Sequence, residues 1–128
     1  MKTILTFAFV AFLAVTTSAV ATNVHSTYTQ GVTNSCFSYF RVHRQQNGAS
    51  LMWAVNQQGV TEFKIERSYD GGGRYEAVDV VPDNGTAQYR YTDRSALPGY
   101  ITYRITATLT DGSTSVSTLE TVRIVSRK

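Results

Sequence analysis

Apolar and polar residues alternate along most of the chain beyond its first third. In the stretch from Thr61 to Tyr69, Phe63 and Ile65 fall on one face, while charged residues occupy the other. The same period of two recurs from Ile101 to Leu109, where apolar residues alternate with threonine and arginine. This period predicts β-strands. A single apolar face on each strand predicts antiparallel sheets with one buried and one solvated side.

The apolar segments predict seven short strands, separated by turns rich in glycine, asparagine and proline. These strands are expected at residues 37–44, 50–55, 61–69, 75–81, 88–92, 101–109 and 113–125. The last is irregular, because Val116 and Val122 share a parity that Leu119 does not, which predicts a bulge between Ser117 and Leu119. Seven strands at this spacing predict an all-β, immunoglobulin-like sandwich of two antiparallel sheets, with Trp53 near its centre.

The first 21 residues have the pattern of a secretory signal peptide. A lysine at position 2 precedes an almost wholly apolar run from Ile4 to Val15, and Ala19-Val20-Ala21 provides small residues before the expected cleavage site. The run is shorter than the roughly 20 apolar residues that span a bilayer. We therefore expect an exported protein, periplasmic or secreted, with no membrane span after cleavage. Residues 22–36 are polar and predict a flexible leader, and residues 37–128 predict the sandwich domain.

Composition limits the choice of partner and of covalent structure. The formal net charge is only +3, which does not indicate a nucleic-acid-binding domain. Cys36 is the single cysteine, so no internal disulfide can form. We expect a monomer with a buried or unused thiol, and a dimer linked through Cys36 remains the alternative.

Several motifs resemble the fibronectin type III domain. Leu51-Met52-Trp53 resembles its second strand, and Leu97 lies six residues before Tyr103, as in its sixth strand. More narrowly, the segments 63–71, 91–93 and 98–105 resemble the fibronectin-like modules of exported Bacteroidetes proteins, and the match covers about residues 37–125. The resemblance implies that Trp53 lies in the core and that Tyr103 bonds back to the backbone of the preceding loop. Nothing resembling the C-terminal sorting domain of such proteins follows, which favours a free protein over one attached to the cell surface.

The sequence offers little that predicts catalysis. His25 falls in the expected leader and His43 on the first strand, and no nucleophile elbow accompanies them. One cysteine and two distant histidines do not form a zinc motif, and the aspartates lie mostly in turns. We therefore expect neither an enzyme nor a cofactor. A polar pocket with His43 beside a carboxylate would favour the opposite conclusion.

Arg67 is the most unusual residue of the predicted strands. By parity it follows Phe63 and Ile65 onto the inward face, where a charge must be paired or must reach solvent. Asp93 is a candidate partner, and we interpret the pair as structural. The predicted structural residues are Trp53, Phe63, Ile65, Arg67, Asp93, Leu97 and Tyr103.

Tyrosines are the best candidates for binding, because exposed aromatic side chains often mark interaction surfaces. Tyr39, Tyr75 and Tyr100 need not all lie in the core. The first hypothesis is a non-enzymatic interaction or structural module whose partner is an unidentified envelope or extracellular protein. The alternative is a small carbohydrate-binding module with a glycan as ligand. A planar row of exposed tyrosines would favour the alternative, and scattered tyrosines would weaken it.

Overall fold

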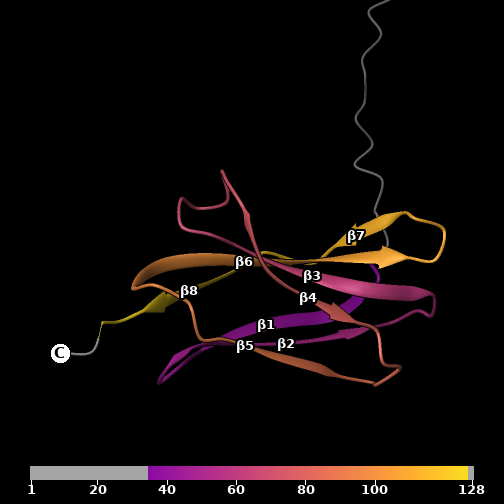
Figure 1. The fold of residues 1–128 in the computed structure, drawn as a ribbon, viewed down its shortest axis with the longest axis horizontal. Coiled ribbons are helices and arrows are strands. Elements are labelled where there is room, and N and C mark those ends of the chain that lie inside the picture. The colour runs from indigo at the N-terminus through magenta and orange to yellow at the C-terminus, as the bar shows by residue number, and fades with distance from the viewer. Residues whose placement is uncertain (1–34, 127–128) are drawn as a thin grey trace, which may run out of the picture.

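The computed structural model describes residues 35–126, which form eight β-strands and no helix. The strands are β1 (Phe37–Gln45), β2 (Gly48–Val55), β3 (Val60–Ser68), β4 (Glu76–Pro82), β5 (Tyr89–Asp93), β6 (Gly99–Leu109), β7 (Thr114–Val116) and β8 (Glu120–Ile124). One sheet has the order β1-β2-β5, and the other has the order β4-β3-β6, with β7 and β8 both paired to β6. All pairs are antiparallel, and the two sheets face each other as layers (Figure 1). The all-β sandwich predicted from the sequence is thereby confirmed.

The expected signal peptide (1–21) and all but two residues of the expected leader (22–36) lie outside the described part of the chain. Those two residues belong to the folded domain. Cys36 is 1% exposed, its amide donates to Ser115 Oγ over 3.1 Å, and its carbonyl accepts from the Asn56 amide over 2.8 Å. The folded domain therefore begins before residue 37. A dimer linked through Cys36 would require this buried thiol to be exposed first.

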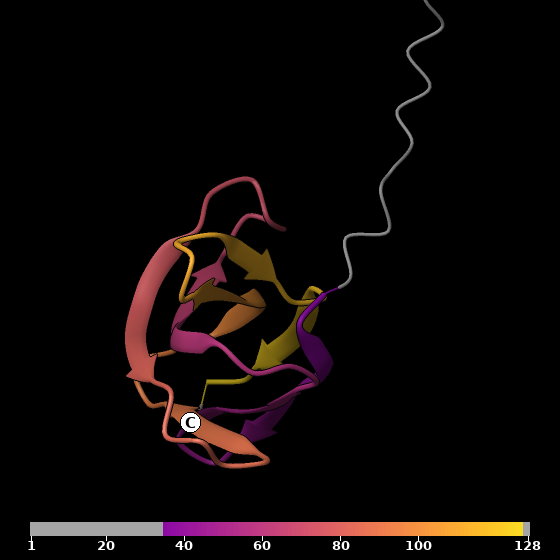
Figure 2. The same cartoon turned by 90° about the vertical axis from the view of Figure 1, so that its right-hand side faces the viewer.

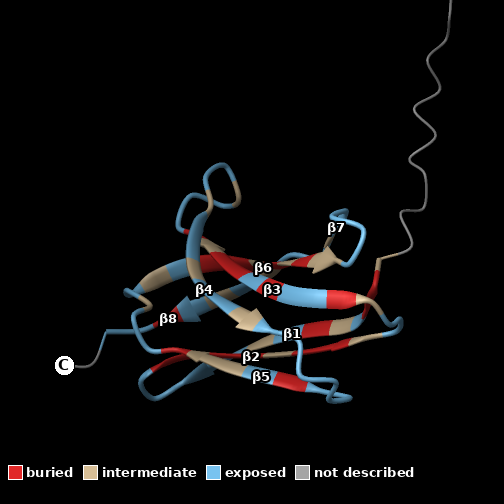
Figure 3. Ribbon diagram, turned by 45° about the vertical axis from the view of Figure 1, so that its right-hand side comes forward, coloured by how far each residue is buried: buried red, intermediate tan, exposed pale blue. Residues whose placement is uncertain are grey.

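The core is built from the inward faces of both sheets, which surround it in Figure 2. Trp53 of β2 is fully buried, with its ring stacked on Tyr89 at 5.5 Å and edge-on to Phe63 of the opposite sheet at 5.5 Å. Ile65 and Tyr103 are also completely buried. Buried positions recur as bands along most strands, whereas the loops and much of β4 are exposed (Figure 3). Alternation along each strand thus places the predicted core residues where burial of their apolar area stabilises the fold.

The irregular last strand of the prediction is two strands in the structure. Three residues, 117–119, lie opposite two residues of β6, so one residue is extra. Ser117 fills the gap: its amide donates to the Ile105 carbonyl and its Oγ accepts from the Ile105 amide, both over 2.9 Å. The extra residue reverses the alternation, so that Val116 is exposed whereas Val122 packs against the core. The predicted irregularity is present, but it ends one strand and starts another.

The outer face of β3 is less exposed than simple alternation predicts. Glu66 is 7% exposed and Ser68 is 1% exposed, although both face away from the core. The segment 69–75 joins β3 to β4 and rises from the sheet as the tall loop of Figure 1. Ser68 Oγ bonds to Asp70 Oδ1 and accepts from the Gly72 amide, which fastens the loop to the end of β3.

Candidate functional site

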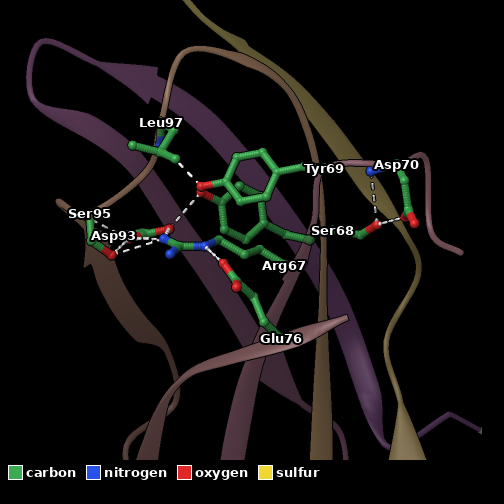
Figure 4. A network of polar contacts seen from close by, with 9 residues as sticks. Arg67, Ser68, Tyr69, Asp70, Glu76, Asp93, Ser95 and Leu97 are labelled. Carbon is green, nitrogen blue, oxygen red and sulfur yellow. Dashed lines mark hydrogen bonds and ion pairs between the residues drawn. The ribbon is translucent and has the colours of Figure 1, made fainter. Parts of the chain in front are cut away.

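The densest polar cluster lies at one end of the sandwich, where four strands from both sheets meet. Arg67 is near the end of β3, Glu76 begins β4, and Asp93 ends β5 of the other sheet. Tyr103 points inward from β6, and Ser95 follows β5. We call Arg67, Glu76, Asp93, Ser95 and Tyr103 the clasp, and Figure 4 shows Arg67 at its centre.

Arg67 holds the clasp together by donating hydrogen bonds to three residues. Its Nη1 donates to Asp93 Oδ1 and Oδ2 over 2.9 and 2.7 Å, and to Ser95 Oγ over 2.9 Å. Its Nε donates to Glu76 Oε1 over 2.6 Å. The Arg67 side chain is 13% exposed and that of Asp93 only 1%, so this ion pair is largely removed from water. The pairing of Arg67 with Asp93 considered from the sequence is therefore present in the structure.

Asp93 has partners for both of its carboxylate oxygens. Tyr103 Oη donates to Oδ2 over 2.8 Å, and the Ser95 amide and hydroxyl donate to Oδ1 over 3.0 and 2.8 Å. Burial alone would raise the pKa of Asp93, but the bonds from Arg67, Tyr103 and Ser95 together lower it below the ordinary value. Burial and the neighbouring Asp93 charge raise the pKa of Tyr103. Asp93 is thus a stable carboxylate and Tyr103 a stable hydroxyl donor.

The clasp corrects the expected role of Tyr103. Tyr103 bonds to the Asp93 side chain, whereas the resemblance implied a bond to the backbone of the preceding loop. The backbone of the loop before β6 bonds instead to Tyr69, whose Oη accepts from the Leu97 amide over 3.1 Å (Figure 4). The reason is that Tyr103 points between the sheets, where the carboxylate of β5 lies, whereas Tyr69 lies just beyond the end of β3.

Leu97 differs from the prediction as well. It was expected among the structural residues, but the residue is 62% exposed. Only its backbone amide takes part in the fold, as the donor to Tyr69. The other predicted structural residues all occupy the core or the clasp.

The geometry of the clasp suits a structural role and not a reaction centre. Both oxygens of the Asp93 carboxylate accept bonds from intramolecular donors, and Tyr103 is held as a neutral donor. Within residues 35–126, no group of three or more histidine, cysteine, aspartate or glutamate side chains is placed to hold a metal ion. His43 is exposed on β1 and has no carboxylate partner among the residues described.

A second polar cluster lies on the outer face of the larger sheet and was missed from the sequence. Arg104 of β6 donates to Glu66 of β3 through Nε and Nη2 over 2.8 and 3.3 Å, and Thr106 Oγ1 donates to Glu66 Oε2 over 2.9 Å. Burial tends to raise the pKa of Glu66, but Arg104 and Thr106 bring it below its usual value. Alternation along the two strands already places Glu66 and Arg104 on outward faces, so the sequence contained part of the signal. What the sequence did not reveal is that β3 and β6 pair with these two residues opposite each other.

The three candidate binding tyrosines do not form one row. Tyr39 is half-buried on β1 of the smaller sheet. Tyr75 ends the loop before β4, and its ring lies against Arg104 of the larger sheet, with the guanidinium carbon 3.8 Å from the ring centre. Tyr100 is 67% exposed on β6, with Arg123 at 5.7 Å from its ring centre. A planar aromatic platform made by these three side chains is absent from this arrangement.

Hollows in the surface lie mainly between loops. One of about 460 Å³ is lined by residues 55–60 together with Asp83, Gly85, Thr86 and Tyr89. A hollow of about 370 Å³ at the other end is lined by Gln45, Gln46, Asn47, Thr92 and Arg94. Among the residues that the structure describes, no helix has the length and apolar character needed to cross a membrane.

Comparisons with known proteins identify the fold but no family. No family model matches the chain, and no curated protein matches it. Among solved structures, the chain is similar to pectate lyase Pel3 from Pectobacterium carotovorum, with a TM-score of 0.57 and 14% identity over 66% of this chain and 26% of the enzyme. It is also similar to pectate lyase PelI from Erwinia chrysanthemi in complex with tetragalacturonic acid, with a TM-score of 0.56 and 15% identity over 66% of this chain and 27% of the enzyme. The chain thus spans about a quarter of each lyase, and at this identity the similarity shows a shared fold alone.

Proposed function

We propose that this chain is an exported, non-enzymatic module that acts by binding a partner through the surface of its sandwich. The observation that carries the proposal is the clasp. Its charged and polar groups bond to one another and join the two sheets, which commits the Asp93 carboxylate and the Tyr103 hydroxyl to holding the fold together. Function then falls to the outer faces, strand edges and loops.

The proposed relationship to fibronectin type III domains has support from the arrangement of the strands. A three-stranded sheet faces a larger one, and a buried tryptophan lies on the second strand between them. Immunoglobulin-like sandwiches use the same architecture to present loops and faces to other molecules. Export rests on the signal-like pattern of residues 1–21.

Glycan binding is the second candidate function. It is favoured by the similarity to a domain-sized part of two pectate lyases, one of them solved with tetragalacturonic acid. Binding through a tyrosine platform is less favoured, because Tyr39 lies on a different sheet from Tyr100 and is separated from Tyr75 as well. A glycan would therefore have to be bound by polar groups more than by stacking.

A retention experiment separates these functions. The exported chain is immobilised, and solubilised envelope and purified polysaccharides of the source organism are passed over it, with blocked matrix as the control. A defined protein partner would establish an interaction module, whereas glycan that free sugar elutes would establish the second candidate. Retention of nothing would count against both and leave a structural role. Release of reducing ends from any polysaccharide by the purified chain would overturn the non-enzymatic assignment.

A further inference from the structure

Charge is distributed unequally between the two sheets. The chain has nine acidic residues, and Asp93 is the only one in β1, β2 or β5. Asp93 points inward and is paired with Arg67, so no carboxylate belongs to the outer face of the smaller sheet. The larger sheet carries both signs on its outer face, including Glu66 and Arg104. The smaller sheet therefore presents a surface of one sign.

Arginines stand in register on that outer face. Arg41 of β1 and Arg90 of β5 both lie opposite Met52 of β2, so the three side chains form one row across the sheet. With strands spaced about 4.8 Å apart, the two arginine backbones are about 10 Å apart. The next row contains His43 and Thr92 on either side of the buried Ser50. The basic face, as we call it, consists of Tyr39, Arg41, His43, Met52, Arg90 and Thr92.

The cations of the basic face are available to a ligand. The Arg41 side chain is 65% exposed, and its one acidic neighbour is Glu120 of β8 at 3.6 Å. An ion pair this exposed and this long contributes little and is readily exchanged. Arg90 is exposed, and its guanidinium has no ion-pair or hydrogen-bond partner among the described residues. Arg90 is free to form a two-pronged bond with a planar carboxylate, and Arg41 can form one by exchanging its long contact with Glu120.

Neutral donors and acceptors adjoin the basic face at one end. The hollow of about 370 Å³ there is lined by Gln45, Gln46, Asn47, Thr92 and Arg94, and Thr92 belongs to the basic face as well. Amide and hydroxyl groups of this kind suit sugar hydroxyls, which both donate and accept hydrogen bonds. Single-stranded nucleic acids call for several stacking aromatic rings, and the face has only the half-buried Tyr39. The combination of exposed arginines with amides and a hydroxyl matches a polymer that carries carboxylates and hydroxyls together.

We propose that the basic face binds an acidic polysaccharide of the polyuronate class, with Arg41 and Arg90 on its carboxylates and the hollow beside Thr92 on its hydroxyls. This inference deepens the proposed binding function and rests on it. It places the site on the sheet opposite to Tyr75 and Tyr100, and it requires no aromatic platform.

The test measures binding of polygalacturonate to the full exported chain by calorimetry at low and at physiological salt. The double variant Arg41→Gln, Arg90→Gln removes two charges from the basic face. The matched control, Arg74→Gln with Arg123→Gln, removes two exposed charges elsewhere. We expect the first to lose about tenfold or more in affinity and the control to stay within about twofold. Both variants should melt within about 4 °C of the wild type, since they change exposed residues only.

Two further ligands test the chemistry. Methyl-esterified polygalacturonate keeps the backbone but lacks the charge, and we expect it to bind at least about tenfold more weakly. A single-stranded DNA oligonucleotide that binds as tightly as polygalacturonate would overturn the glycan assignment. Equal losses in both double variants, or no binding of polygalacturonate at all, would overturn the inference too. If the retention experiment nevertheless yields a defined partner, the broader proposal of a binding module stands without it.

Discussion

Arg67 is a buried charge whose desolvation is offset by bonds from several elements. Its guanidinium joins Asp93, Ser95 and Glu76, so that strands of both sheets converge on one side chain. Its inward position could be predicted from parity alone, because it follows Phe63 and Ile65 by even steps. The contributions of Ser95 and Glu76 could not, since they depend on how β4 and β5 end near β3 in space.

Replacing Arg67 with alanine tests the clasp directly. The change leaves the Asp93 carboxylate buried at 1% exposure without its cation, although Tyr103 and Ser95 still donate to it. We expect a loss of about 3 kcal/mol in unfolding free energy, and a melting temperature lower by about 10–20 °C. Circular dichroism during heating measures the latter.

The control for this change is Arg94→Ala, which removes an exposed arginine immediately after Asp93. It should alter the melting temperature by a few degrees at most. Ligand binding by Arg67→Ala below its melting temperature should persist, because the clasp does not lie on the basic face. An unchanged melting temperature would show that the clasp contributes nothing to stability.

Acid should weaken the fold through the same carboxylate. The pKa of Asp93 lies below its ordinary value of 3.8 in the folded chain, so the unfolded chain binds protons first as pH falls. The stabilisation is complete above the unfolded pKa and is lost as pH falls through the folded one. We expect the unfolding free energy in urea to hold steady from about pH 7 to 5 and to decline below about pH 4.

Two carboxylate variants identify the source of that decline. Asp93→Asn should be less stable at neutral pH and should show a shallower acid decline than the wild type. Glu62→Gln, which changes an exposed side chain on β3, should retain the full decline. The pKa of Glu66 is also lowered, so part of the decline should survive in Asp93→Asn. An acid decline that is identical in all three proteins would exclude Asp93 as a contributor.

At the level of elements, six of the seven predicted strands agree closely with the structure. Their boundaries follow from alternation and from turn residues, both of which are local properties of the sequence. The seventh could not be placed, because the extra residue among 117–119 is defined only against its partner β6. The burial of Ser68 escaped prediction for a similar reason, as it depends on the path of the loop that follows β3. Whether Tyr39, Tyr75 and Tyr100 share one surface could not be predicted either, because it depends on which sheet each strand joins.

The hairpin between β1 and β2 depends on Gly48. Its φ of 134° is in the region that favours glycine, and a Cβ at this position would overlap the carbonyl oxygen of Asp93. Asn47 does not have a positive φ, so the turn comprises residues 46–47 and Gly48 already belongs to β2. Gly48 is therefore required both for its backbone conformation and for the close approach of β5.

Alanine at Gly48 should destabilise the protein by about 3 kcal/mol or more, because strain and overlap add. Gly112→Ala is the matched control, since Gly112 also has a positive φ, of 82°, but open space where a Cβ would lie. The control should lose only the strain, about 1–2 kcal/mol. Urea unfolding of both variants measures the difference, and equal losses would show that β5 can shift to accept the methyl group.

For the whole molecule, the clasp and the core predict that the two sheets unfold together. Trp53 is the only tryptophan, and it lies on the smaller sheet against Phe63 of the larger one. Its fluorescence therefore reports the packing of one sheet on the other, whereas far-ultraviolet circular dichroism reports the strands themselves. Because Arg67 and Trp53 each bridge the sheets, neither sheet retains a covered apolar face once the other leaves. We expect the two signals to give one denaturant transition with the same midpoint, as in a two-state domain.

In Arg67→Ala both midpoints should fall by the same amount. A fluorescence change that precedes the loss of circular dichroism would mean that the sheets separate before they unfold, and that the clasp is a local contact without influence on the cooperativity of the sandwich.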